Sequence, residues 1–216
     1  MSRSIDLLKK RYLENIKEKP DLFVGIELEY PVINLEGKAT DSEVVKDLFR
    51  YLPSVLGFTI EKVDDFGNPI QLFDPVSQDT ILFEVSYTTI EFAFGRAEFI
   101  QEVEVRFRDY MDLIQKKLSK ANYAIIGSGI HPYWDKNDNQ PVSYARYQML
   151  MNYLKLSRTV LGTDLHDYPE YGAFICGSQV QLDVSKSNYL RVINAFNQIE
   201  AAKAFLFANS EFSGED

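Results

Sequence analysis

The sequence predicts an α+β protein built on a mainly antiparallel sheet. Two observations lead to this class. Apolar residues alternate with polar ones in several short segments, which is the period of half-buried strands, and recur every three to four residues in others, which is the period of helices. The two kinds of segment follow one another without the regular rhythm of a parallel strand–helix–strand protein. No internal repeat or linker-like stretch interrupts the 216 residues, so we expect residues 1–216 to form a single domain.

The first half of the chain is expected to form two helices and two pairs of strands. Residues 4–18 place apolar side chains at helical spacing, and so do residues 41–52, which Asp41 or Ser42 can cap. The strand period appears in these ranges: 21–33, the two arms of 57–74 around the turn Asp65–Pro69, and 81–94, which is broken at Ser86–Thr89.

The second half is expected to contain three helices and two strands. Residues 97–120 carry the clearest apolar stripe: Phe99, Ile100, Val103, Phe107, Met111, Ile114 and Leu118. Three less regular segments follow: a strand and glycine-rich bend at 122–133, a helix at 143–160 and a strand at 173–185. The last segment, 187–208, predicts an amphipathic helix that turns these side chains toward the core: Leu190, Ile193, Phe196, Ile199 and Phe205.

Composition and charge exclude several classes of partner. The chain carries a net charge of −9, which repels a phosphate backbone, so nucleic acid is not expected as a partner. No run of about 18 apolar residues is present, and the N-terminus lacks the apolar core of a signal peptide, so no membrane association is expected. The single cysteine, Cys176, cannot form an intrachain disulfide and fits a reducing, cytoplasmic location, most simply as a small buried apolar residue.

Carboxylates alternate with apolar residues in the strand-like segment VGIELEYPV. Because successive side chains of a strand point to opposite faces, Val24, Ile26 and Leu28 share one face, and Glu27 and Glu29 project side by side from the other, roughly 7 Å apart. Half-exposed strands alternate in this way as a rule, so a solvated surface is the simpler interpretation of any one of these glutamates.

Two further segments repeat the pattern of an apolar face and a polar face. In ILFEVSYTTIEFAF, Glu84 and Glu91 oppose the apolar residues, and in GSQVQLDVS, Gln179 and Gln181 do so. If these strands belong to one sheet, their polar faces can form one cleft, where gathered carboxylates need a cation to neutralise them. Hard oxygen ligands select magnesium, manganese or calcium, and such an acidic, metal-loaded cleft suits the phosphates of a nucleotide.

Two other side chains are candidates for contacts with a substrate. His131 lies on the glycine-rich bend GSGIHPYW, where it can contact a substrate or be a loop histidine bonded to the backbone. Arg146 can hold a substrate carboxylate with its guanidinium fork, or be a surface arginine of a helix. No phosphate-binding loop motif is present.

The motifs together resemble the glutamate–cysteine ligase family, in particular the plant-type branch shared with many bacteria. VGIELEYPV resembles the family's opening strand, in which a glycine precedes a Glu-x-Glu pair, and FEVSYTTIEFAF resembles its LEPGGQFEL-like segment with Tyr87-Thr88-Thr89 in place of Gly-Gly-Gln. RYQMLMNYL resembles the RYEIMRNYM helix, GSQVQLDVS the TVQVNLDFS strand, and FLFANSEFSGED the ALFANSPF segment. The matches run in order from about residue 22 to residue 213.

This resemblance implies a fold and a reaction. The fold would be like glutamine synthetase, a curved antiparallel sheet with the active site on its concave face and helices packed outside. The reaction would join the γ-carboxylate of L-glutamate to the amine of L-cysteine, the first step of glutathione biosynthesis. ATP would first phosphorylate the carboxylate, and the amine would then displace phosphate. Magnesium or manganese would be the cofactor and ATP the co-substrate.

The resemblance also implies roles for individual residues. Glu27, Glu29, Glu84 and Glu91 match the family's metal ligands. The remaining matched side chains are Gln179 and Gln181 on the nucleotide and metal side, and Arg146, Met149 and His131 on the substrate side. No residue is singled out as a catalytic acid, base or nucleophile.

Family members are roughly twice as long as this chain. The resemblance therefore implies the N-terminal portion of a longer carboxylate–amine ligase, which we expect not to be a competent ligase by itself. An open sheet edge would favour self-association, so a homo-oligomer is expected. Two alternatives remain open from the sequence: a ligase of the same class with another amino-acid acceptor, and a non-catalytic binding module with the same fold.

Overall fold

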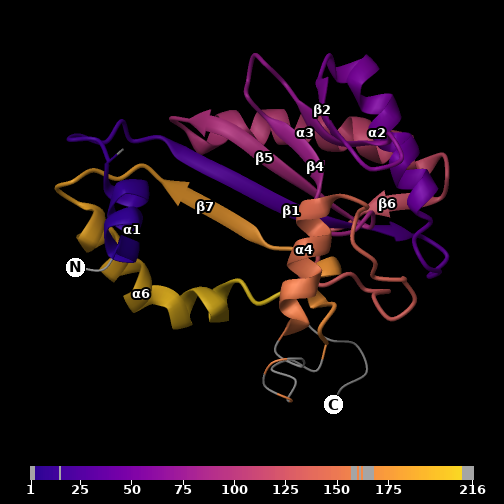
Figure 1. Cartoon of the computed structure of the whole chain (residues 1–216). Coiled ribbons are helices and arrows are strands. Elements are labelled where there is room, and N and C mark those ends of the chain that lie inside the picture. Colours follow the sequence, from indigo (N-terminus) through magenta and orange to yellow (C-terminus); the bar gives the residue numbers. More distant parts are fainter. Residues whose placement is uncertain (1–2, 15, 157–159, 161, 163–167, 211–216) are drawn as a thin grey trace.

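A seven-stranded sheet organises the molecule and confirms the predicted α+β class (Figure 1). The computed structural model describes residues 3–14, 16–156, 160, 162 and 168–210. The strands follow the order β2-β3-β4-β5-β1-β6, and β7 also pairs with β1. Every one of these pairs is antiparallel, as predicted.

The strands fall where alternation of polar and apolar residues predicted them. Their bounds are β1 Val24–Asn34, β2 Thr59–Val63, β3 Pro69–Phe73, β4 Thr80–Phe83, β5 Thr89–Ala97, β6 Tyr123–Ile125 and β7 Ser178–Leu182. The predicted break between β4 and β5 is present, and the strand predicted at 122–133 is limited to its first residues. β1 is long enough to pair with β5 along one edge and with both β7 and β6 along the other.

The α-helices also lie in the predicted segments, with shifted ends, whereas the 3-10 helix η1 was not predicted and its last residue falls in the segment 173–185 that was predicted as a strand. Their bounds are α1 Arg3–Leu13, α2 Ser42–Leu56, α3 Ile100–Ser119, α4 Ala145–Leu154, the short 3-10 helix η1 Tyr171–Ala173, and α6 Tyr189–Leu206. Asp41 is the cap of α2, because its side chain accepts a hydrogen bond from the Glu43 backbone N–H. Residue 15 of the first predicted helix and residues 157–159 of the fourth lie outside the described part of the chain.

The apolar core lies between one face of the sheet and the two helices α2 and α3. Helix α2 contributes Val45, Leu48, Phe49 and Leu52, and helix α3 contributes Val103, Tyr110, Ile114 and Leu118. The predicted stripe of α3 was wrong at its start: Phe99 precedes the helix and Ile100 begins it, and both are more than half exposed. They extend beyond the sheet that covers the later turns of the helix.

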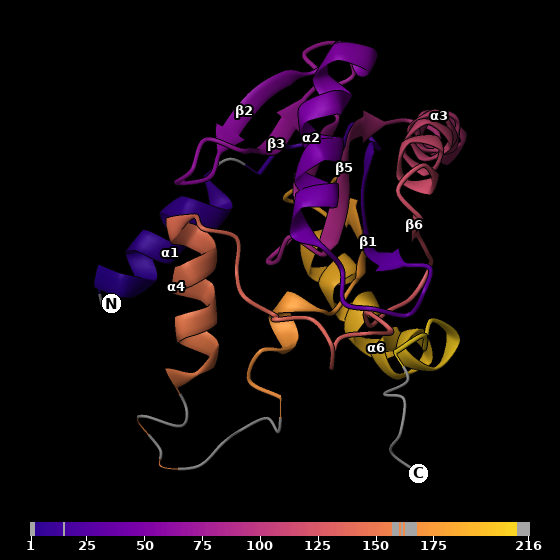
Figure 2. The same ribbon diagram turned by 90° about the vertical axis from the view of Figure 1, so that its right-hand side faces the viewer.

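Helix α4 lies on the opposite side of the sheet from α3 (Figure 2). The Tyr147 hydroxyl donates a hydrogen bond to the Phe83 carbonyl, and Met151 packs with Val85 and Ala173 in a second, smaller apolar cluster. The polar face of the sheet thus has α4 over one part of it, while α2 and α3 cover the apolar face.

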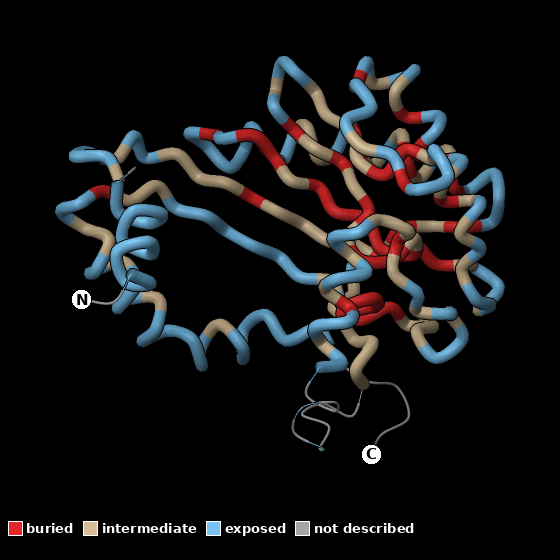
Figure 3. Tube along the Cα trace, in the orientation of Figure 1, coloured by how far each residue is buried: buried red, intermediate tan, exposed pale blue. Residues whose placement is uncertain are grey.

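The elements at the other end of the molecule are exposed (Figure 3). No described residue of α1 or α6 is buried, and all five residues of β7 are exposed. The prediction that the apolar side chains of 187–208 face the core was therefore wrong: Leu190, Ile193, Ile199 and Phe205 are exposed and Phe196 is only partly buried. No described helix combines the length and the apolar character that crossing a membrane requires.

Strand β7 leaves one edge of the sheet open. Its only strand partner among the described residues is β1. At the two ends of the ladder, the Gly177 carbonyl accepts from the Glu29 N–H of β1, and the Asp183 N–H donates to the carbonyl of Phe23, the residue before β1. By the alternation of an antiparallel pair, Ser178, Val180 and Leu182 then direct their backbone N–H and C=O groups away from β1. The segment SQVQL carries no charge that would protect this edge.

Candidate functional site

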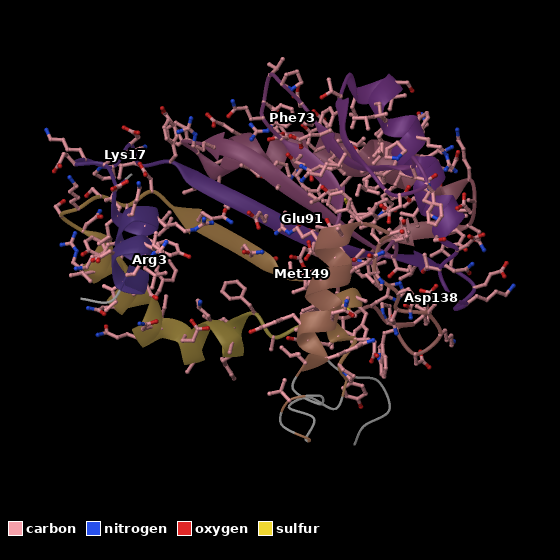
Figure 4. The ribbon with its side chains drawn as sticks, in the orientation of Figure 1. Arg3, Lys17, Phe73, Glu91, Asp138 and Met149 are labelled. Carbon is pink, nitrogen blue, oxygen red and sulfur yellow. The ribbon has the colours of Figure 1, made fainter. Side chains whose placement is uncertain are left out.

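Glu29 and Glu91 face each other on neighbouring strands at the centre of the sheet. They are directly opposed in the antiparallel ladder of β1 and β5. The apolar neighbours Leu28, Ile90 and Phe92 pack into the core, so alternation directs the two glutamates to the other face, as predicted. Figure 4 shows Glu91 on the sheet and Met149 on α4, the helix that lies over this face.

Glu84 joins this pair from the next strand. It follows β4 directly, and its backbone N–H bonds to the Thr89 carbonyl, which continues the ladder by one more pair. One carboxylate oxygen from each of Glu29, Glu84 and Glu91 lies within 4.8 Å of the other two. We call these three residues the carboxylate cluster. The structure therefore brings together three of the four glutamates that the sequence analysis singled out.

Glu27 lies on the same face beside the carboxylate cluster. The register places it opposite Ala93 on β5 and Gln179 on β7, so it has no carboxylate as a direct neighbour. The Gln181 amide donates a hydrogen bond of 2.8 Å to Glu27. Gly25 permits this approach, because a Cβ there would lie 2.6 Å from the Gln181 Oε1 atom. Both predicted glutamines thus adjoin the glutamates of β1.

The carboxylate cluster retains protons at neutral pH. Burial, followed by the charges of Glu84 and Glu27, raises the pKa of Glu29 to about 7, against the opposing effect of the Gly177 N–H. Burial and then the hydrogen bond with Glu84 raise the pKa of Glu91 to about 9. Glu29 and Glu91 thus ionise less readily than an ordinary glutamate, because each is partly buried and lies beside other carboxylates. Three negative charges are therefore unfavourable here without a neutralising partner.

The donor set fits a hard divalent cation. All three groups of the carboxylate cluster offer oxygen, which magnesium and manganese prefer over nitrogen or sulfur. With a magnesium–oxygen distance of about 2.1 Å, two ligand oxygens are at most about 4.2 Å apart. A spacing of up to 4.8 Å therefore requires only a small inward rotation of the side chains. The cation would take the place of the protons that now limit repulsion.

Two side chains near the carboxylate cluster were not predicted from the sequence. Burial, Glu84 and Glu91 raise the pKa of Tyr147, which keeps its hydroxyl protonated. Burial and then Glu29 and Glu84 raise the pKa of Cys176. Cys176 is partly buried, as the sequence suggested, but it lies beside two carboxylates. Its position in the predicted strand 173–185, directly before the polar segment GSQVQLDVS, was the only sign of this in the sequence.

We expect the Cys176 thiol to react slowly with iodoacetamide at pH 8. The thiolate is the nucleophile, and the raised pKa leaves little of it. The folded chain should be labelled about tenfold more slowly than the chain in denaturant, as followed by intact mass. Since the chain has one cysteine, no other site complicates the measurement. Equal rates in the two states would contradict the placement of this thiol.

Arg146 and Met149 lie on the exposed side of α4. Arg146 is exposed, and its charge acts on the neighbouring Tyr147. Met149 is 61% exposed. Neither contacts the carboxylate cluster through a hydrogen bond or an ion pair within the described residues. Their assignment to substrates therefore stays a prediction.

His131 is fully buried and bonded within the protein. Its Nε2 atom lies 3.0 Å from the Val32 carbonyl and 3.2 Å from the Thr40 hydroxyl, and its Nδ1 atom accepts from the Tyr133 N–H. Burial lowers its pKa, so the ring is neutral. This geometry matches the alternative considered from the sequence, a loop histidine bonded to the backbone. It offers no support for the substrate contact, which stays a prediction.

The segment that replaces Gly-Gly-Gln still forms a tight turn without glycine. The Ser86 hydroxyl donates to the Ala173 carbonyl and lies 2.9 Å from the Thr88 hydroxyl. Tyr87 donates to Asp64. These bonds fix the connection between Glu84 and Glu91 and so set the spacing of two members of the carboxylate cluster.

The family model described as glutamate–cysteine ligase family 2 (GCS2) matches residues 23–214. This range includes all four predicted glutamates, Gln179 and Gln181. No curated protein matches the chain at the significance required. The mainly antiparallel sheet, with five α-helices among the described residues, is consistent with the glutamine synthetase-like fold of that family.

Proposed function

Because this chain belongs to glutamate–cysteine ligase family 2, whose members are ATP-dependent carboxylate–amine ligases, we propose that it serves to join the γ-carboxylate of L-glutamate to an amino-acid amine. L-cysteine is the acceptor we propose first, which would make the reaction the first step of glutathione biosynthesis. The observation that carries the proposal is the carboxylate cluster, with oxygen donors from β1, from β5 and from the residue that follows β4, on the face that α4 overlies.

The proposed cofactor is magnesium or manganese, held by Glu29, Glu84 and Glu91 with Glu27 beside them. When bound, the ion neutralises the charge of the ATP phosphates and of the phosphoryl group in transfer. The protein's own residues supply the frame. β1 and β5 fix two of the carboxylates in register, and the Gly177 N–H orients Glu29 with a bond of 2.6 Å. Rigid strands keep these groups in place while the substrates react.

Gln179 and Gln181 are proposed to line the nucleotide side. Their amides lie along the exposed strand β7, next to the glutamates of β1. On the substrate side, the Arg146 guanidinium is suited to hold a carboxylate in a fork, and Met149 presents a soft, apolar surface to the acceptor. ATP phosphorylates the γ-carboxylate, and the attacking amine displaces phosphate from the acyl phosphate to form the amide.

The identity of the acceptor is tested by coupled ADP release from the full-length ligase, since this chain alone is proposed to be incompetent, with glutamate, magnesium and a panel of amino acids. Cysteine should give the highest kcat/KM if the glutathione assignment holds, and another amino acid would redirect the proposal to a different member of the same class. Titration calorimetry with magnesium and ATP tests the binding site separately. No heat of binding, together with no loss of ADP release when Glu84→Gln is made in the full-length ligase, would favour a non-catalytic module.

We also propose that residues 1–216 are one domain of a longer ligase and that the chain is incompetent alone. The open edge of β7 and the exposed side chains of α6 support this, and the same edge supports self-association. Appreciable ADP release by this chain alone would contradict the first of these proposals. The single thiol supports a cytoplasmic, reducing location.

A further inference from the structure

Thr89 carries a buried hydroxyl group that has no hydrogen-bond partner among the described residues. The residue is fully buried at the start of β5, and its Oγ1 atom neither donates nor accepts a hydrogen bond. A buried hydroxyl without a partner is costly, because it has lost its bonds to water and gained none in return. Such a group in a well-packed sheet requires an explanation.

The side chain of Thr89 lies on the same face as the carboxylate cluster. Thr89 and Glu91 are two residues apart on β5, with no irregularity in their pairing to β1, so their side chains share a face. The β4–β5 register continues from the Phe83–Ile90 pair to Glu84 and Thr89, whose backbones are joined by a hydrogen bond. Directly opposed side chains have Cβ atoms about 5 Å apart, so the hydroxyl is within reach of the Glu84 carboxylate.

The members of the carboxylate cluster differ in the donors that support them. Glu29 receives the Gly177 N–H and a side-chain hydrogen bond from Gln179. Glu84 has no such backbone donor among the described residues, and its carboxylate bonds to that of Glu91. A carboxylate that ligates a metal with one oxygen is normally held through the other by a hydrogen bond. Glu84 lacks this donor, and Thr89 has a donor without an acceptor.

We propose that Thr89 is a positioning residue of the cation site, and that its hydroxyl donates to the Glu84 carboxylate when a divalent cation draws that carboxylate away from Glu91. The inference rests on the proposed function, because it needs a cation bound to the carboxylate cluster. The Thr89 hydroxyl, which has no partner among the described residues, would find its acceptor when the cation is bound. Tyr87-Thr88-Thr89, which stands where the family has Gly-Gly-Gln, thereby supplies a polar group of its own next to Glu84.

Removal of the Thr89 hydroxyl should therefore have opposite effects on the stability of the metal-free chain and on the binding of the cation. Thr89→Val has nearly the same shape and remains β-branched, so it suits the strand. Without cation, the valine chain should melt at the same or a higher temperature, because it no longer buries an unpartnered hydroxyl. With cation, it should bind more weakly, because Glu84 loses its support. A side chain that merely fills space would not produce this opposition.

The experiment uses Mn²⁺ alone as the probe, with binding followed by electron paramagnetic resonance on the wild-type, Thr89→Val and Thr89→Ser chains, together with thermal melting of each without metal. Thr89→Val should weaken Mn²⁺ binding about tenfold, and Thr89→Ser, which keeps the hydroxyl, should stay within about threefold of the wild type. Melting without metal should not fall for the valine chain.

The outcomes separate this inference from the proposed function. If the wild-type chain binds no Mn²⁺, the cation site itself is wrong and both proposals fall. Equal affinities of the wild-type and valine chains would overturn the role of Thr89 alone. A melting temperature of the valine chain well below that of the serine chain would show that the hydroxyl serves the unloaded fold, which also overturns the role given to Thr89.

Discussion

Glu91→Gln should raise the stability of the metal-free chain at pH 8.5 and remove its stabilisation by magnesium. The folded chain holds the pKa of Glu91 at about 9, far above the ordinary value of 4.5. Between these values the folded state binds more protons than the unfolded state, so stability falls as the pH rises through this window. Glu29, with a pKa of about 7, adds to the fall between pH 4.5 and 7. Glutamine does not ionise, so the Glu91→Gln chain avoids the part of this fall in stability that is due to Glu91.

The expected gain of the Glu91→Gln chain at pH 8.5 is on the order of 2 kcal/mol, after allowance for solvent screening of a partly exposed group. It should shrink toward zero below about pH 4, under the ordinary pKa of 4.5, where Glu91 is protonated in both the folded and the unfolded state. Urea unfolding with and without 5–10 mM magnesium, about the range in which weak sites fill, provides the measurement. The wild-type chain should gain stability from the ion at pH 8.5, and the variant should not.

Glu98→Gln is the matched control, because Glu98 is an exposed glutamate in the connection between β5 and α3. It should change neither the slope with pH nor the response to magnesium. If the Glu91→Gln chain keeps the wild-type pH dependence, the protonated carboxylate cluster is not the source of that dependence. If it keeps the response to magnesium, the ion binds elsewhere.

Asp79→Ala should cost about 3–5 kcal/mol of unfolding free energy, because it removes the acceptor of a buried ionic network. Asp79 is 1% exposed and accepts hydrogen bonds from the Gly95 N–H at 2.7 Å, the Arg106 Nε atom at 2.8 Å and the Tyr110 hydroxyl at 2.8 Å. Alanine would leave a buried amide, a buried phenol and a guanidinium without their partner. Urea denaturation of both chains gives the difference.

Two further variants show whether the network is the cause. Asp79→Asn keeps an acceptor oxygen but not the charge, so the unfolding free energy of this chain should lie between those of the wild-type and alanine chains. Asp112→Ala, at an exposed position of α3, should stay within about 0.5 kcal/mol of the wild type. A loss at Asp79 no larger than that at Asp112 would mean that α3 is held to the sheet by apolar packing alone.

Alternation of side chains predicted the strands and most of the carboxylate cluster because it is enforced by the core. Leu28, Ile90 and Phe92 must face α2 and α3 or the neighbouring apolar side chains, so Glu29 and Glu91 have no choice of face. What alternation could not predict is register. A slide of two residues keeps every face correct, and only the actual pairing shows that Glu29 opposes Glu91 while Glu27 opposes Ala93.

The misplaced helix faces have a different cause. The apolar spacing in α6 correctly indicated a helix, but it says only which face favours a partner and not whether one is present. Leu190 and Phe205 are exposed because no described element covers them. Thr89 illustrates the same limit for polar groups, since a hydroxyl in a strand is ordinary in the sequence and becomes informative only when its burial and its lack of partners are known.

The outward backbone groups of Ser178, Val180 and Leu182 allow a further strand to pair with β7 and so to enlarge the polar face of the sheet. A strand added antiparallel to β7 would have its pleat set by the one already there, so its alternate side chains would line up beside Gln179 and Gln181. Residues from another polypeptide segment would then continue the row that starts at Glu27 without any rearrangement of β1. Whatever occupies this edge becomes a neighbour of the polar face, and a residue that blocks the edge would remove that neighbour without touching a single glutamate.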